Sequence, residues 1–139
     1  MSSTLNAFNQ IEQKLLEIAK SIPEVVEVTA AETYKFRSPR IYVWIREGES
    51  RDATISGTKR TFRIRFEYVI DVVHPNPEKA YSLAKQIAWT LHDKLMQNRT
   101  LGGLVRDVQP SAYFFKEDIP TDQGFGQRWI MYVDVEVDL

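Results

Sequence analysis

The sequence contains no cysteine and only two histidines among its 139 residues. Disulfide bonds, thiolate nucleophiles and zinc sites built from cysteine are therefore excluded. His74 and His92 stand in different settings, and neither has a carboxylate in an HExxH-like register, so histidines at a strand end and on the surface are a better interpretation than a metal site. We expect no metal and no organic cofactor.

Neither sign of charge dominates, since 18 lysines and arginines face 19 aspartates and glutamates. The chain thus lacks the overall basic field that drives nonspecific binding to nucleic acid. No apolar run approaches the roughly 20 residues needed to cross a bilayer, and no signal-peptide pattern precedes the first helix. We expect a protein of the cytosol, with no membrane partner and without DNA binding as its main task.

The first third of the chain contains one clear helix and less regular strands. Apolar residues recur at helical spacing over residues 5–22, and Pro23 ends the pattern. Strands are predicted over 25–34 and 41–46. A long charged connection is predicted over 48–58; it exceeds ordinary hairpin loops, so either it is mobile or a partner orders it.

The clearest pattern begins at Thr61. Apolar and polar side chains alternate over residues 61–72, which predicts a half-buried antiparallel strand. Asn76 and Pro77 then form a helix start, and the helix is predicted from Glu78 to Asn98. Its expected core face holds these residues: Ala80, Leu83, Ala84, Ile87, Leu91 and Leu95.

The last third predicts a glycine turn and two strands. Gly102 and Gly103 supply left-handed backbone angles after the helix. Strands follow over 104–116 and 127–139, joined by a loop over 117–126. The element order α-β-β-β-α-β-β predicts one α+β domain over residues 1–139, with a single largely antiparallel sheet of about five strands and two helices packed on one face.

This arrangement resembles the tail terminator (tail completion) proteins of long-tailed bacteriophages. The resemblance rests on the long strand, the Pro-capped helix, the TLGGLV turn at 100–105, the aromatic strand and the final strand, and it covers residues 60–139 well and the first sixty in outline. It implies a structural virion protein that forms a ring, commonly hexameric. Such a ring caps the tail tube, stops its polymerisation and offers a docking face to the neck. DNA would pass through the lumen only in transit.

One side of the predicted second helix carries residues that do not belong to its core face. Trp89 is the most unusual of them, because a large indole in mid-helix is unfavourable in water. The first helix, a loop or another subunit would cover it. The candidate subunit interface comprises Tyr81, Lys85, Trp89, His92 and Met96.

The charged connections are candidates for contact with the tail tube, the neck or the lumen. They are selected for length and charge alone. The candidate residues are Glu49, Arg51, Asp52, Lys59, Arg60, Asp118 and Asp122.

Two strands carry alternating charges. Asp134, Glu136 and Asp138 share one face of the last strand, and a solvated face is the commoner explanation, although in the family such a face would help to line a lumen. If the long strand lies beside the last one, Arg63 and Arg65 can pair with Asp134 and Glu136.

No residues form a credible catalytic set. Gly102 and Gly103 follow a helix and lack the lysine of a phosphate loop, and no serine lies in a GxSxG elbow. We therefore expect an assembly component rather than an enzyme. The alternatives are a neck, connector or tail-tube subunit, a small ligand-binding α+β domain, and an enzyme with an unrecognised site.

Overall fold

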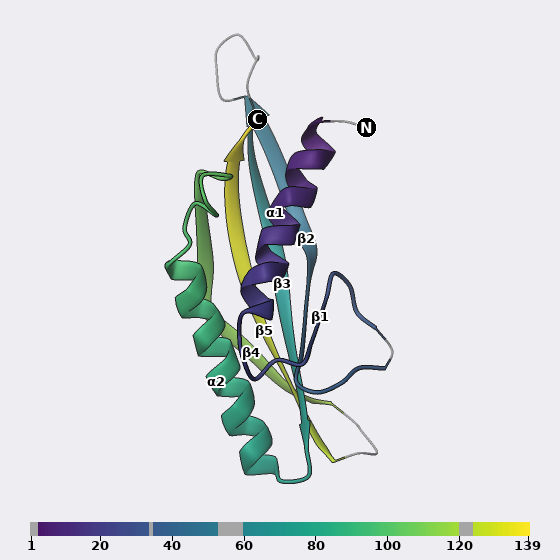
Figure 1. Ribbon diagram of the computed structural model, residues 1–139. Helices are drawn as coiled ribbons and strands as arrows, with labels where there is room; N and C mark the ends of the chain where they lie inside the picture. The colour runs from purple at the N-terminus through teal and green to yellow at the C-terminus, as the bar shows by residue number, and fades with distance from the viewer. Residues whose placement is uncertain (1–2, 34, 53–59, 120–123) are drawn as a thin grey trace.

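The computed structural model describes residues 3–33, 35–52, 60–119 and 124–139. They form two layers, a sheet and a pair of helices that cover one of its faces (Figure 1). The helices are α1 (Ser3–Lys20) and α2 (Pro77–Met96). The predicted α+β class, with two helices and a mostly antiparallel sheet, is confirmed.

Five strands form one sheet within the described ranges. In spatial order they are β1 (Glu27–Thr29), β2 (Arg40–Asp52), β3 (Arg60–His74), β5 (Phe125–Asp138) and β4 (Asp107–Ile119). The short β1 pairs in parallel with the start of β2, and all other pairs are antiparallel. The long strand β3 is therefore the centre of the sheet, which explains why its pattern was the clearest in the sequence.

Side-chain and backbone chemistry set both ends of α2. The Asn76 side chain accepts hydrogen bonds from the backbone N–H groups of Glu78 and Lys79, at 2.9 and 3.3 Å, as the capping pattern predicts. After the helix, Gly102 and Gly103 have φ angles of 73° and 89°. The left-handed turn predicted at the two glycines is confirmed, because only glycine adopts such angles without a steric penalty.

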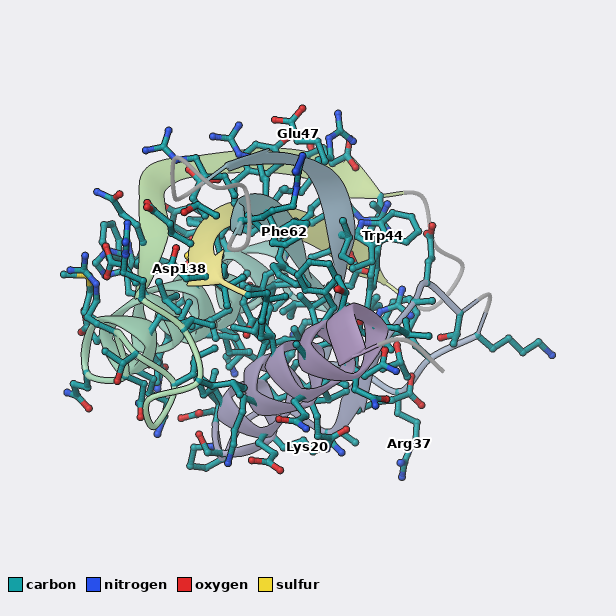
Figure 2. The ribbon with its side chains drawn as sticks, turned by 90° about the horizontal axis from the view of Figure 1, so that it is seen from above. Lys20, Arg37, Trp44, Glu47, Phe62 and Asp138 are labelled. Atoms are coloured by element: carbon teal, nitrogen blue, oxygen red, sulfur yellow. The ribbon has the colours of Figure 1, made fainter. Side chains whose placement is uncertain are left out.

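The core lies between the helices and one face of the sheet. Alternate residues of β3 point into it, and Figure 2 shows Phe62 in the middle of the molecule. The ring centres of Phe62 and Phe8 lie 5.3 Å apart in a T-shaped arrangement, and the Tyr68 hydroxyl donates a hydrogen bond of 2.7 Å to the carbonyl of Leu15. From α2, the buried residues are Ala80, Ala84, Ile87, Ala88, Leu91 and Leu95. The predicted core face of α2 is thus correct except at Leu83, which is only partly buried, and at Ala88, which is buried but was not predicted.

Strand boundaries differ from the prediction. The strand predicted over 25–34 shrinks to Glu27–Thr29. By contrast β2 continues to Asp52, so residues 48–52 belong to a strand and not to a connection. A register shift between Ile45 and Glu47 breaks the apolar alternation there, and pairing with β3 maintains the strand beyond it. Similarly, β4 extends to Ile119 and β5 begins at Phe125.

The polar face of β3 is not uniformly solvated. Arg63 is exposed, but Glu67 and Asp71 are buried. At Asp71 the reason is the segment that joins β1 to β2, of which residues 30–33 and 35–39 are described. Its Thr33 and Glu32 accept hydrogen bonds from Arg40 and Arg128, the two partners of Asp71. Its Phe36 ring lies 4.0 Å from the guanidinium carbon of Arg40, which is itself 1% exposed.

Candidate assembly surfaces

The five candidate interface residues of α2 lie together as a continuous strip. Their spacing of three or four positions places them on one side of the helix. The Lys85 ammonium lies 5.2 Å from the centre of the Tyr81 ring, and the rings of Trp89 and His92 meet at 5.4 Å. Met96 continues the row at the end of the helix. These residues, Tyr81, Lys85, Trp89, His92 and Met96, are called the α2 strip below.

The strip is partly open to solvent. Trp89 is 46% exposed, Met96 44% and Tyr81 41%. The sequence left open whether α1 or a loop covers Trp89, and the described part of the chain leaves nearly half of the side chain uncovered. An exposed row of two aromatic residues and a methionine is typical of protein–protein contacts, where these residue types are enriched.

The charged candidates do not form one site. Arg60 begins β3, and its backbone forms hydrogen bonds of 3.0 and 2.9 Å with Leu139. Asp118 of β4 lies opposite Gln127 of β5, which lies opposite Val72, near the other end of β3. Between these two positions β3 runs from Thr61 to Val72, a length of about 36 Å. Arg60 and Asp118 are both exposed, but they lie at opposite ends of the sheet.

The remaining charged candidates cannot be placed in the same way. Glu49, Arg51 and Asp52 lie in β2, and their side chains are outside the described residues. Lys59 and Asp122 also lie outside the described residues. Their predicted contacts with a tube, a neck or a lumen stay predictions.

The predicted pairing across β3 and β5 is confirmed. Arg65 donates two hydrogen bonds to Asp134, at 2.8 and 3.1 Å, and Arg63 lies 3.7 Å from Glu136. Arg106 adds ion pairs of 2.9 Å to both Glu136 and Asp138. Each of the three alternating carboxylates of β5 therefore has an arginine partner. The face is therefore a set of ion pairs and not a purely acidic surface.

A depression of about 460 Å³ lies on this charged face. Its walls come from β2, β3, β4 and β5, and both acidic and basic groups line it. Asp107 stands at one side, where two hydrogen bonds of 2.8 Å from Arg99 hold the pKa of its carboxyl below the usual value. The lining charges are Glu47, Arg63, Arg65, Asp107, Asp134 and Glu136.

A second charged cluster, which the sequence did not reveal, lies against the segment that joins β1 to β2. Asp71 has no exposed surface and accepts hydrogen bonds from Arg40 at 2.7 Å and from Arg128 at 2.8 Å. The Asp71 contact holds the pKa of Arg128 above its ordinary value. Burial raises the pKa of the neighbouring Tyr42 to about 12, with smaller effects from the surrounding charges.

This cluster forms hydrogen bonds between the sheet and the segment that joins β1 to β2. Arg40 donates a 2.8 Å hydrogen bond to the Thr33 hydroxyl, and Arg128 donates one of 3.2 Å to Glu32. Arg40, Asp71 and Arg128 lie side by side on three neighbouring strands, with Arg40 opposite Asp71 and Asp71 opposite Arg128. Their sequence separations are 31 and 57 residues, so no local pattern could have found them.

Across the described ranges, no group of three or more histidine, cysteine, aspartate or glutamate side chains is arranged to hold a metal ion. None of the described helices is long and apolar enough to cross a membrane.

Comparisons with known proteins give limited matches. No protein-family model matches the chain, and no curated protein sequence does. A solved structure described as the virion of a native gene transfer agent particle contains a chain with a TM-score of 0.45 and 14% identity, over 96% of this chain and 92% of that one. A likeness at this level does not assign a family or a function.

Proposed function

We propose that this protein is a structural virion component, a ring-forming tail terminator. The observation that carries the proposal is the exposed α2 strip, which is a surface suited to contact between subunits. The resemblance of residues 60–139 to tail terminators supports it, and the capped helix and left-handed turn of that resemblance are present in the fold. The ring would be a homo-oligomer, commonly a hexamer.

In this proposal the protein acts by binding and not by catalysis. Each ring needs side contacts between subunits and two end faces for different partners. The two ends of the sheet, marked by Arg60 and Asp118, are about 36 Å apart by strand length, which suits contacts with a tube on one side and a neck on the other. Occupying the docking surface of the last tube ring would stop further polymerisation. No cofactor is required.

The ion-paired face of the sheet is suited to line a channel through which DNA passes. Arg65 and Arg106 are already engaged by carboxylates, so few cations are available to bind phosphates. Such a face would neither retain DNA nor present a purely acidic wall.

A tube-polymerisation assay tests this function. Purified protein added to polymerising tail-tube subunits should shorten the tube length distribution and leave a ring at one tube end in electron micrographs. Cells that lack the protein should produce overlong tails or tails without heads. Tubes of unchanged length together with normal head attachment would contradict the terminator role.

Neighbouring roles in the same particle give different results in that assay. A tail-tube subunit would polymerise by itself, and a neck or connector protein would bind heads without changing tube length. A ligand-binding domain is favoured by one observation, the charged depression of about 460 Å³. In that case the protein should be a monomer that binds a small zwitterionic or charged molecule, with affinity lost in Arg65→Ala.

A further inference from the structure

The α2 strip lies at one edge of the sheet, on its helical side. The Tyr81 ring is 5.8 Å from the ring of Trp129 in β5, which is the neighbour of the edge strand β4. At the other end of the strip, Arg99 contacts the Met96 sulfur at 3.9 Å and pairs with Asp107, the first residue of β4. The strip therefore runs above the β4 edge.

A second exposed apolar surface lies at the opposite edge, beside β2. Ile45 is 47% exposed, and its partner across the strands is Phe66, which is buried in the core. Paired residues on neighbouring strands point to the same side of a sheet, so Ile45 points to the helical side. The partner strand β1 ends at Thr29, opposite Tyr42, and does not reach Ile45.

The α1 helix completes this second surface. Gln10 and Lys14 line a groove with the turn at 101–104, which shows that their side of α1 faces the end of α2. Leu5 and Glu12, seven residues apart, lie on the other side of the helix, toward β1 and β2, on which α1 packs. Leu5 is 49% exposed. Leu5, Glu12 and Ile45 are called the β2-edge flank below.

Each surface carries a charge without a counter-ion of its own. Glu12 is partly buried and has no ion pair with another described residue, and burial raises the pKa of its carboxyl. Lys85 is exposed and likewise has no carboxylate partner in the described ranges, since its ammonium lies over the Tyr81 ring. An anion on one edge and a cation on the other are complementary between two copies of the chain.

We propose that the α2 strip of one copy docks on the β2-edge flank of the next copy, with Lys85 opposite Glu12. This inference rests on the proposed ring function and names the two surfaces that form the ring contact. Two different patches at opposite edges give a head-to-tail contact, which closes into a ring when the rotation between subunits allows it. A symmetric contact between two α2 strips would leave the Glu12 carboxylates without a cation.

A charge exchange in the full-length protein tests the contact. Molar mass is measured by light scattering over a range of concentrations for Lys85→Glu, Glu12→Lys and the double variant. Each single variant should raise the dissociation constant of the oligomer on the order of tenfold, because like charges then face each other. The double variant restores opposite charges and should return the constant to within about threefold of the original protein.

Lys79→Glu is the matched control. Lys79 is exposed on α2 but lies well away from the strip, so this charge reversal should leave the oligomer unchanged. Circular dichroism checks that every variant is folded. Glu12→Gln keeps the size of the side chain and should also weaken the oligomer, which preserves the test if Glu12→Lys does not fold.

The outcomes separate this inference from the proposed function. An oligomeric protein whose single variants leave the mass unchanged, or whose double variant is not restored, overturns the pairing of these two surfaces and leaves the ring function standing. A protein that is monomeric at all concentrations contradicts the ring function itself. Restoration in the double variant alone establishes that Lys85 and Glu12 meet between copies.

Discussion

Arg40 and Asp71 are buried together on the face of the sheet away from the helices, with a guanidinium nitrogen 2.7 Å from a carboxylate oxygen. Arg128 shares the same carboxylate, at 2.8 Å. The guanidinium groups of Arg40 and Arg128 are thus both paired with the carboxylate of Asp71, which has no exposed surface. The consequence for stability is direct, because an unpaired buried charge costs far more than an exposed one.

Replacing Asp71 with alanine should lower the free energy of unfolding by about 3–5 kcal/mol, since Arg40 would be left buried without its anion. Urea denaturation measures the change. Asp134→Ala is the control, because the exposed pair with Arg65 should contribute only about 0.2–1 kcal/mol. Equal losses in the two variants would show that the buried cluster has no special role.

The pair of Arg65 and Asp134 should show a small coupling energy. Both side chains are well exposed, at 40% and 54%, so water and salt screen their attraction. A double-mutant cycle with alanine should give about 0.2–1 kcal/mol at low ionic strength and less at 1 M salt. A coupling above this range that does not respond to salt would contradict the expectation.

Trp89→Glu should leave the chain folded and reduce its oligomer mass. Nearly half of the indole is exposed, so its loss does not open the core, whereas removal of an aromatic side chain from a subunit contact can cost about 2 kcal/mol or more. Light scattering and circular dichroism give the two readings. Unchanged mass would remove Trp89 from the interface, and unfolding would mean that it supports the fold.

Gly103→Ala should destabilise the protein by about 1 kcal/mol through the backbone alone. The φ angle at Gly103 is 89°, and an added Cβ would meet no atom within 4 Å, so crowding makes no contribution. Gly103→Asn should lose less, because asparagine tolerates left-handed angles better than alanine. Thermal unfolding of the two variants compares them, and equal losses would contradict the backbone explanation.

Stability should decline in alkaline solution because burial raises the pKa values of Tyr42 and Tyr68. Burial raises the pKa of Tyr42 to about 12 in the folded protein, from an ordinary value of 10.0. Its contribution is fully present below the ordinary value and is lost as the pH rises toward 12, because the unfolded chain releases the proton first. Urea unfolding at several pH values above 9 measures the slope. Tyr42→Phe should reduce the slope and leave the part that comes from Tyr68, and an unchanged slope would show that Tyr42 makes no contribution.

The local elements could be predicted because their signals lie within a few residues. Asn76 and Pro77 start a helix wherever an amphipathic stretch follows, and Gly102 accepts an angle that other residues avoid. Likewise, the alternation over residues 61–72 indicates a strand, whichever strands pair with it. The class of the fold and the exposed side of α2 follow from the spacing of apolar residues in the helices and strands.

The failures occur where pairing overrides local pattern. Residues 48–52 look like a charged connection, yet they extend β2 because β3 offers partners past a register shift. Residues 30–33 look like a continuing strand, yet the segment that contains them leaves the sheet edge and contacts its polar face. Both outcomes depend on contacts between residues far apart in the sequence, the pairing of β2 with β3 and the hydrogen bond from Arg128 to Glu32.

The sequence by itself determined the class of the fold, the presence of the two helices and the core face of β3. Only the tertiary structure decided the burial of Asp71 between Arg40 and Arg128, and the separation of Arg60 from Asp118. The physical reason is the range of the forces involved. Periodicity and capping act over one turn or one strand, whereas burial and charge pairing depend on the register that brings distant strands together.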